Sequence, residues 1–227
     1  MTLLTGSVLD RIPGPKYTAK LRFAELALRA PQPRPATLRR ARAQLPEAFV
    51  VALRAPKSAL VSARGPLRFD AELEQNFSWV LAARDALSAG LVVLPTPADL
   101  TPGKRDRDLL AELAARLPRQ PGRHWVWEPS GPWQPEEAAA LASSLGLVLA
   151  FDPLLAERPP GDVAYARLRA LGARSSFSDA ALEQVLEQLA VVPEAESFVA
   201  IDAERSFMAA QRLQRLALGG GAESDLS

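Results

Sequence analysis

Short apolar runs alternate with amphipathic stretches along most of this chain, and this alternation restricts its fold most. Seven runs have the length and composition of buried strands, namely 23–28, 49–53, 91–94, 125–127, 147–151, 163–168 and 198–201. An eighth strand fits residues 3–9. Parallel strands need crossover connections, so the alternation predicts an α/β fold. Eight such strands predict a TIM-type (β/α)8 barrel.

Helical patterns follow most of these runs, at residues 36–45, 70–89, 106–117, 135–145, 178–190 and 206–218. We expect an irregular or shortened first strand–helix unit, and no clear helix between strands six and seven. An open doubly wound sheet is the alternative. Its nucleotide-binding version has no support, because no strand is followed by Gly-x-Gly-x-x-Gly or a Walker A loop. The predicted organisation is a single barrel domain over 1–218 and a disordered tail over 219–227.

The composition excludes several kinds of site. The 227 residues include no Cys and one His. Disulfide scaffolds, thiolate metal sites and Cys nucleophiles are therefore excluded, as is any metal site with two imidazoles. We expect no metal and no cofactor. No apolar run approaches the roughly 18 residues of a membrane span, and the N-terminus has no signal-peptide pattern, so a cytoplasmic protein without membrane contact is expected.

Charge is unevenly distributed along the chain. Residues 1–68 hold 13 basic and 3 acidic side chains, whereas the remainder holds 14 basic and 23 acidic ones. This asymmetry is typical either of a polyanion-binding face or of two parts that neutralise one another. Arg39, Arg40 and Arg42 have no aromatic residues interleaved with them, so base stacking is not expected. We therefore expect weak nucleic-acid binding at most and rank a protein partner above nucleic acid.

Charged residues share the inward phase of several predicted strands. Side chains alternate between the two faces of a strand. We take the more apolar face as the one under the helices, so the opposite face is expected to point into the barrel. This phase selects a balanced set: Glu25, Arg29, Arg54, Glu128, Asp152, Arg167, Arg169 and Asp202. Most lie at C-terminal strand ends, where barrel enzymes have their sites. A ligand site and an ion-pair network that plugs the barrel mouth both fit, because buried charges need partners.

As a ligand site, this set has definite roles. Glu128 and Asp152 would be the catalytic acid and base. The ligand-binding side chains would be Glu25, Arg54, Arg167, Arg169 and Trp133. Trp133 fits stacking on a sugar or base and capping of the core equally well. We predict that Glu25, Glu128, Asp152 and Arg167 converge in one cavity.

Several segments match motifs of one known family. Residues 23–26 resemble its Phe-x-x-Val-Glu-Ile strand, and 45–57 resemble its Pro-x-x-Phe and Phe-x-x-Lys segment. Trp127-Glu128 with Trp133 resembles Val-Glu-x-Arg-His-x-x-Trp, and 165–168 resemble Tyr-x-Arg-Leu-His-Gly. These motifs are those of the YecE-like family (domain of unknown function 72), whose members are similar to TIM barrels and have no settled activity. The resemblance covers about residues 20–217.

The departures from the family pattern bear on function. The Arg-His after Glu128 and the His-Gly after Leu168 are absent, whereas Glu25, Glu128, Asp152 and Arg167 are kept. If the family is enzymatic, this chain lacks general acid/base groups. The resemblance then implies a pseudoenzyme that binds a protein partner or a polar or anionic ligand at the C-terminal mouth. The alternative is a hydrolase or lyase on a phosphorylated, sugar-like or nucleic-acid substrate, with Arg167 as anion clamp.

Overall fold

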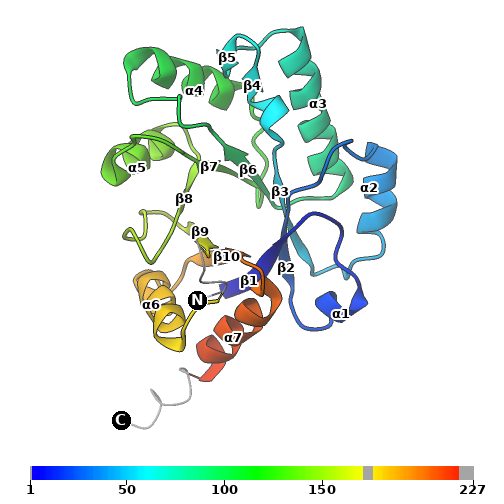
Figure 1. Cartoon of the computed structure of the whole chain (residues 1–227), viewed down its shortest axis with the longest axis vertical. Helices are drawn as coiled ribbons and strands as arrows, with labels where there is room; N and C mark the ends of the chain where they lie inside the picture. Colours follow the sequence, from blue (N-terminus) through cyan, green and yellow to red (C-terminus); the bar gives the residue numbers. More distant parts are fainter. Residues whose placement is uncertain (1, 171–175, 220–227) are drawn as a thin grey trace. The chain divides into compact units, whose positions relative to one another are not determined.

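Eight parallel strands form the framework of the chain in a computed structural model, which describes residues 2–170 and 176–219 (Figure 1). Their order, β1-β10-β9-β8-β7-β6-β3-β2, closes on itself, so the predicted α/β barrel is confirmed. The strands are β1 (Thr2–Leu9), β2 (Phe23–Leu26), β3 (Val50–Arg54), β6 (Leu91–Pro95), β7 (His124–Glu128), β8 (Val148–Phe151), β9 (Val163–Arg169) and β10 (Glu196–Asp202).

Helices follow most strands. Within the described residues they are α1 (Pro15–Thr18), α2 (Pro35–Arg42), α3 (Ala71–Ala86), α4 (Lys104–Arg116), α5 (Pro135–Ser144), α6 (Asp179–Ala190) and α7 (Ser206–Gly219). Two of these helices, α3 and α6, begin after a side-chain N-cap. The Asp70 carboxylate accepts the Leu73 N–H, and the Ser178 hydroxyl accepts the Ala181 N–H. No helix in this part of the chain is both long and apolar enough to cross a membrane.

The described residues group into two compact units, and those of the first lie at 2–9, 13–25, 150–170 and 176–219. In it, β1 pairs with β10, and β10 pairs with β9 from Glu196 opposite Val163 to Asp202 opposite Arg169. Helix α7 packs on β1 and beside α6, as Figure 1 shows in red and yellow.

The first strand–helix unit is shortened, as the sequence predicts. β1 itself is continuous over Thr2–Leu9 and pairs with β10 from Thr2 to Ser7. Its middle is tightly packed: a Cβ on Gly6 would lie 2.1 Å from the Phe23 carbonyl oxygen. The helix that follows, α1, has only four residues, so the first unit is shortened in its helix alone.

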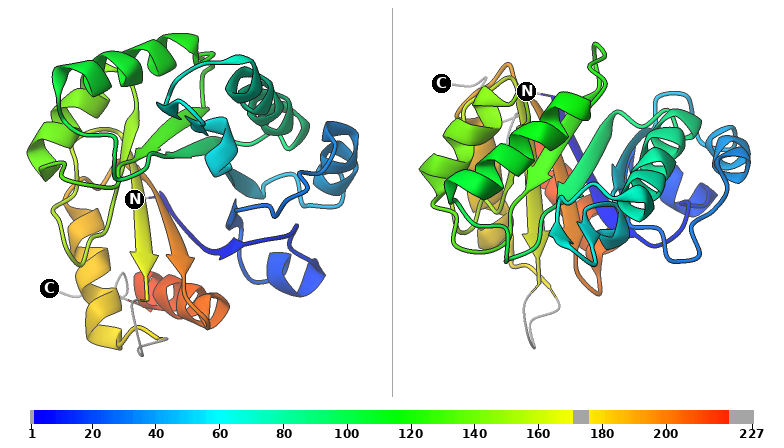
Figure 2. Two further views of the ribbon diagram at one scale, coloured as in Figure 1. Left: turned by 45° about the horizontal axis from the view of Figure 1, so that its top comes forward. Right: turned by 90° about the horizontal axis from the view of Figure 1, so that it is seen from above.

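The second unit contains Asp10–Ile12 and Leu26–Leu149. In it, β3 pairs with β6 and β6 pairs with β7, all in parallel. After β3 come a 3-10 helix, η1 (Lys57–Ala59), and a small antiparallel hairpin of β4 (Val61–Ser62) and β5 (Gly65–Pro66). Helix α3 packs against η1 and β4, and Figure 2 shows it in teal beside this cyan segment.

The connection between β8 and β9 has no helix, as the sequence predicts. Local hydrogen bonds order it instead. The Asp152 carbonyl accepts the N–H groups of Leu155 and Ala156, and the Arg158 guanidinium donates to the Gly161 carbonyl. At the end of the chain, the predicted tail lies outside the described residues except for Gly219, which ends α7. The single domain over 1–218 stays a prediction.

Candidate functional site

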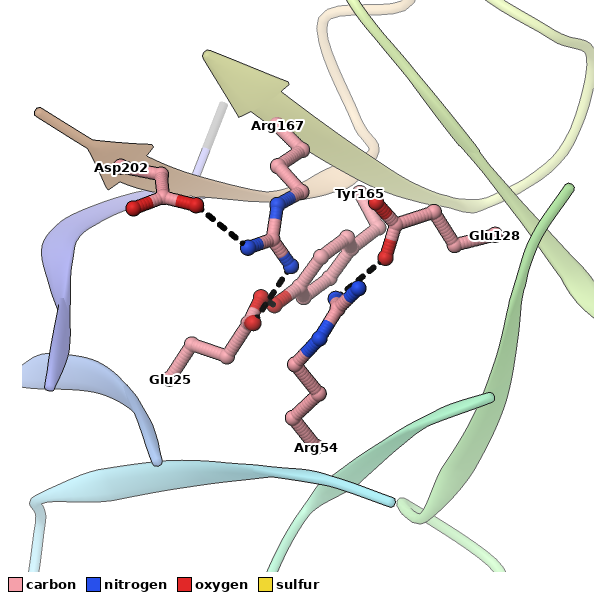
Figure 3. Close-up of polar contacts among 6 residues, drawn as sticks. All are labelled: Glu25, Arg54, Glu128, Tyr165, Arg167 and Asp202. Atoms are coloured by element: carbon pink, nitrogen blue, oxygen red, sulfur yellow. Dashed lines mark hydrogen bonds and ion pairs between the residues drawn. The ribbon is translucent and has the colours of Figure 1, made fainter. Parts of the chain in front are cut away.

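Glu25 is the centre of a buried polar network in the first unit, drawn in Figure 3. Its side chain is 0% exposed. Oε1 accepts a hydrogen bond from Nη1 of Arg167 at 2.6 Å, and Oε2 accepts one from the Tyr165 hydroxyl, also at 2.6 Å. Nη2 of Arg167, which is 6% exposed, donates to Oδ2 of Asp202 at 2.8 Å. The network therefore joins one cation to two carboxylates and a phenol.

Strand periodicity explains how this network forms. Tyr165 and Arg167 are two residues apart on β9 and so share a face. Asp202 ends β10, the neighbouring strand. Short, charge-assisted hydrogen bonds of this kind satisfy groups that would otherwise be costly to bury. Because carboxylates on both sides balance the Arg167 charge, this geometry fits the ion-pair alternative better than an anion clamp.

A second ion pair lies at C-terminal strand ends in the second unit. Arg54 ends β3, and Glu128 ends β7. Nη1 of Arg54 is hydrogen-bonded to Oε2 of Glu128, and both side chains are largely buried (Figure 3). The pairing of β6 with both strands brings these ends together, since Arg54 is opposite Val93 and Glu128 is opposite Pro95.

A cavity of about 430 Å³ opens at the C-terminal ends of β2, β3 and β6 in the second unit. Its polar lining residues are Arg54, Lys57, Thr96 and Ser130, and no carboxylate lines it. Lys57 is exposed, and its ammonium forms no hydrogen bond or ion pair with any residue that the structure describes. The volume lies within the range of about 300–1,000 Å³ that is usual for ligand pockets.

Backbone and indole hydrogen bonds hold two lining residues of this cavity, Thr96 and Ser130. The Thr96 N–H donates to the Glu128 carbonyl at 3.0 Å, and the Ser130 N–H donates to the Thr96 carbonyl at 3.1 Å. The Thr96 hydroxyl also accepts the Trp127 indole N–H at 2.9 Å. These bonds fix both hydroxyl residues of the lining before any ligand arrives.

Trp133 packs edge-on against Trp127, with 4.9 Å between the ring centroids. Its indole N–H donates to the Leu100 carbonyl at 2.8 Å. These contacts favour the core-capping alternative for Trp133, because both the ring and its donor already have partners. Its role in ligand binding stays a prediction.

Asp152 and Arg169 both belong to the first unit. The half-buried Asp152 follows β8, and its Oδ1 accepts the Leu154 N–H at 3.0 Å. Burial raises the pKa of the Asp152 carboxyl, while the Leu154 N–H and the positive charge of Arg169 act against that rise. Arg169 is exposed at the end of β9.

Of the four residues predicted to converge, the structure therefore joins Glu25 to Arg167. Glu128 pairs with Arg54, and the Asp152 side chain bonds the turn that follows it. A single cavity shared by all four residues stays a prediction. In the part of the chain that is described, no three Asp, Glu or His side chains are grouped so that they could hold a metal ion.

Proteins of known structure share this fold. A DUF72 family protein from Thermotoga maritima has a TM-score of 0.68 and 14% identity, with 96% of this chain and 99% of that chain covered. A DUF72 family protein from Enterococcus faecalis has a TM-score of 0.70 and 12% identity, over 95% and 94%. The chain has the fold of the DUF72 proteins.

Endonuclease IV from Thermus thermophilus also has this barrel, with a TM-score of 0.61 and 15% identity over 96% of this chain and 99% of that chain. No protein-family model matches the sequence, and no curated protein does either. The resemblance to DUF72 proteins predicted from sequence motifs is thus confirmed in the fold.

Sequence reasoning did not include Lys57 among the site residues. A signal was present, since Lys57 is a basic residue that follows the end of β3 by three residues. It begins a 3-10 helix, where the two-residue period used to select inward side chains no longer applies. Tyr165 has the inward phase of β9 but was not assigned a role, because a phenol carries no charge to mark it.

Proposed function

We propose that this chain is a diverged DUF72-type barrel that binds a small anionic ligand rather than catalysing a reaction. The supporting observation is the cavity at the C-terminal ends of β2, β3 and β6, which two cations and no carboxylate line. Such ends are where barrels of this type bind their ligands. The family histidines that are missing after Glu128 and Leu168 agree with binding without proton transfer.

Lys57 is the residue that would contact the anion. Glu128 balances the charge of Arg54, so the net positive charge of the lining comes from Lys57. An ammonium donates charge-assisted hydrogen bonds to a carboxylate or phosphate oxygen, and these are stronger than neutral ones. The hydroxyl of Ser130 is a further donor in the same lining.

A small ligand is favoured over a protein partner by the form of the site. A cavity of about 430 Å³ suits a small molecule that enters it. A protein partner would require a broad contact surface of roughly 800 Å² on each side.

The alternative is a hydrolase or lyase that uses Glu128 and Asp152. The raised pKa of Asp152 favours it, because a carboxyl with a raised pKa is better suited to act as a general acid. The similarity to an endonuclease is compatible with a phosphorylated substrate, although one fold supports many activities. Two carboxylates already balance Arg167, the proposed anion clamp, and this weighs against the alternative.

Calorimetric titration with acetate and with inorganic phosphate tests the proposal. We expect millimolar binding by the parent protein, and binding at least tenfold weaker in Lys57→Met, which removes the charge but keeps an unbranched side chain. Lys20→Met is the matched control, because Lys20 is an exposed lysine outside the cavity. Failure of the parent to bind either anion, or equal binding by Lys57→Met, would refute the proposal.

Two further variants, Glu128→Gln and Asp152→Asn, test the enzyme alternative. Turnover of a chromogenic phosphodiester that is lost in both Glu128→Gln and Asp152→Asn would support the hydrolase alternative. Turnover that is absent from the parent, or that survives both substitutions, contradicts it.

A further inference from the structure

The cavity at the C-terminal ends of β2, β3 and β6, which Lys57 lines, also has apolar walls. Seven of its eleven lining residues are apolar, and they are Ala27, Leu28, Ala55, Pro56, Val61, Pro95 and Pro97. All seven are aliphatic or proline side chains, so the lining offers no aromatic ring for stacking. Such walls gain free energy against an aliphatic body that displaces water from them.

We infer that the ligand of this cavity is an amphiphilic monoanion: one carboxylate on a short aliphatic body. This inference rests on the proposed function and names the ligand class of the same site. The carboxylate would lie at Lys57, which is exposed, and the aliphatic body would lie against the buried or half-buried apolar walls.

The net charge of the cavity lining favours a ligand with a single negative charge. Arg54 and Glu128 form an ion pair, so their charges balance, and Lys57 leaves one uncompensated positive charge in the lining. A monoanion matches that charge. A phosphate dianion would bring a second negative charge close to the buried Glu128 carboxylate, with no further cation in the lining to meet it.

Hydrogen-bonding capacity argues against a sugar. Thr96 and Ser130 supply the only side-chain hydroxyls of the lining, and the Thr96 oxygen already accepts the Trp127 indole N–H. A sugar has hydroxyl groups on nearly every carbon, and each would lose water without gaining a protein partner. Burying such groups unpaired costs free energy, so a polyhydroxylated body is disfavoured.

The walls are rigid before the ligand binds. Three prolines line the cavity, and each fixes its own backbone φ angle. The Ala55 N–H donates to the Val93 carbonyl at 2.8 Å, and the Leu100 N–H donates to the Pro97 carbonyl at 3.1 Å. A preformed pocket loses little entropy on binding, so affinity should follow the apolar contact area of the ligand.

Affinity for a homologous series of acids tests this inference. Acetate, butyrate and hexanoate are titrated by calorimetry into the parent protein, together with uncharged 1-hexanol. We expect each added methylene to tighten binding by about two- to fourfold. In Lys57→Met, hexanoate should bind at least tenfold more weakly, whereas 1-hexanol should bind as it does to the parent.

A second pair of variants separates the apolar walls from the charge. Val61→Thr places a hydroxyl in the lining with almost no change of shape, and it should reduce the gain per methylene. Val191→Thr is the matched control, because Val191 is an exposed valine outside the cavity, and it should leave the series unchanged.

The outcomes distinguish this inference from the proposed function. Equal affinities for acetate and hexanoate in the parent, with binding lost in Lys57→Met, would overturn the amphiphilic ligand and leave the anion site intact. No binding of any acid would overturn both. Phosphate that binds more tightly than hexanoate would also overturn the monoanion.

Discussion

Arg167 is the residue whose removal tests the buried network of the first unit most directly. Its guanidinium donates to Glu25 at 2.6 Å and to Asp202 at 2.8 Å. Arg167→Ala removes this cation from beside a carboxylate that is 0% exposed. Removing one partner of a buried ion pair costs about 3–5 kcal/mol, because the other charge stays buried without compensation.

The size of the effect can be stated for two measurements. In a chain of this length, 1 kcal/mol shifts Tm by about 2–4 °C, so Arg167→Ala should lower Tm by roughly 6–20 °C. Arg40→Ala is the matched control, because Arg40 is an exposed arginine on α2 whose side chain forms no hydrogen bond or ion pair with any residue that the structure describes. It should change the free energy of unfolding by less than about 0.5 kcal/mol.

Urea unfolding, followed by tryptophan fluorescence, measures these free energies. The double variant Glu25→Gln/Arg167→Met removes both charges at once and should recover most of the lost stability, since no buried charge is left alone. Two results would refute the reasoning: an Arg167→Ala protein within about 1 kcal/mol of the parent, or a double variant as unstable as the two single variants combined.

Three further predictions concern other parts of the chain. Burial raises the folded-state pKa of Asp152, so its contribution to stability falls as pH rises from its ordinary value of about 3.9 through the raised pKa. Asp152→Asn, which keeps the oxygen that accepts the Leu154 N–H, should therefore have a higher Tm than the parent at neutral pH and no advantage in acid; a lower Tm at neutral pH would contradict this. Gly6→Ala should cost about 1–3 kcal/mol in urea unfolding, because its Cβ would collide with the Phe23 carbonyl, whereas Gly14→Ala meets open space and should cost little. A labelled oligonucleotide titrated at low salt should bind weakly at most, and tight binding that weakens steeply with salt would show that the basic N-terminal third forms a polyanion-binding face.

The barrel could be predicted because its strands and helices follow simple periods. The strand at residues 3–9 has the weakest sequence pattern of the eight, because Thr5, Gly6 and Ser7 interrupt the apolar run and yet are buried. The Thr5 hydroxyl is satisfied by donating to the Ala210 carbonyl. A sequence pattern treats such residues as exposed, because it does not show the tertiary partners that allow their burial.

The sequence predicted which residues belong to the candidate site better than it predicted which of them pair with one another. Inward phase selected Glu25, Arg54, Glu128 and Arg167, and each of them forms an ion pair. Which carboxylate meets which arginine depends on the register of strands far apart in sequence. That register is set by packing over the whole barrel, so local patterns do not contain it.

The observed ion pairs bear differently on the two alternatives that the sequence left open, an ion-pair network that plugs the barrel mouth and a ligand site. Around Arg167 the positive charge is balanced within the network, so an incoming anion would have to displace a buried carboxylate. At Lys57 the positive charge is uncompensated, and aliphatic walls lie beside it. Binding there requires electrostatic attraction and apolar contact, and neither needs a proton donor or acceptor. The proposed function is therefore ligand binding without catalysis. The titrations of Lys57→Met, together with turnover assays of Glu128→Gln and Asp152→Asn, test these two statements separately.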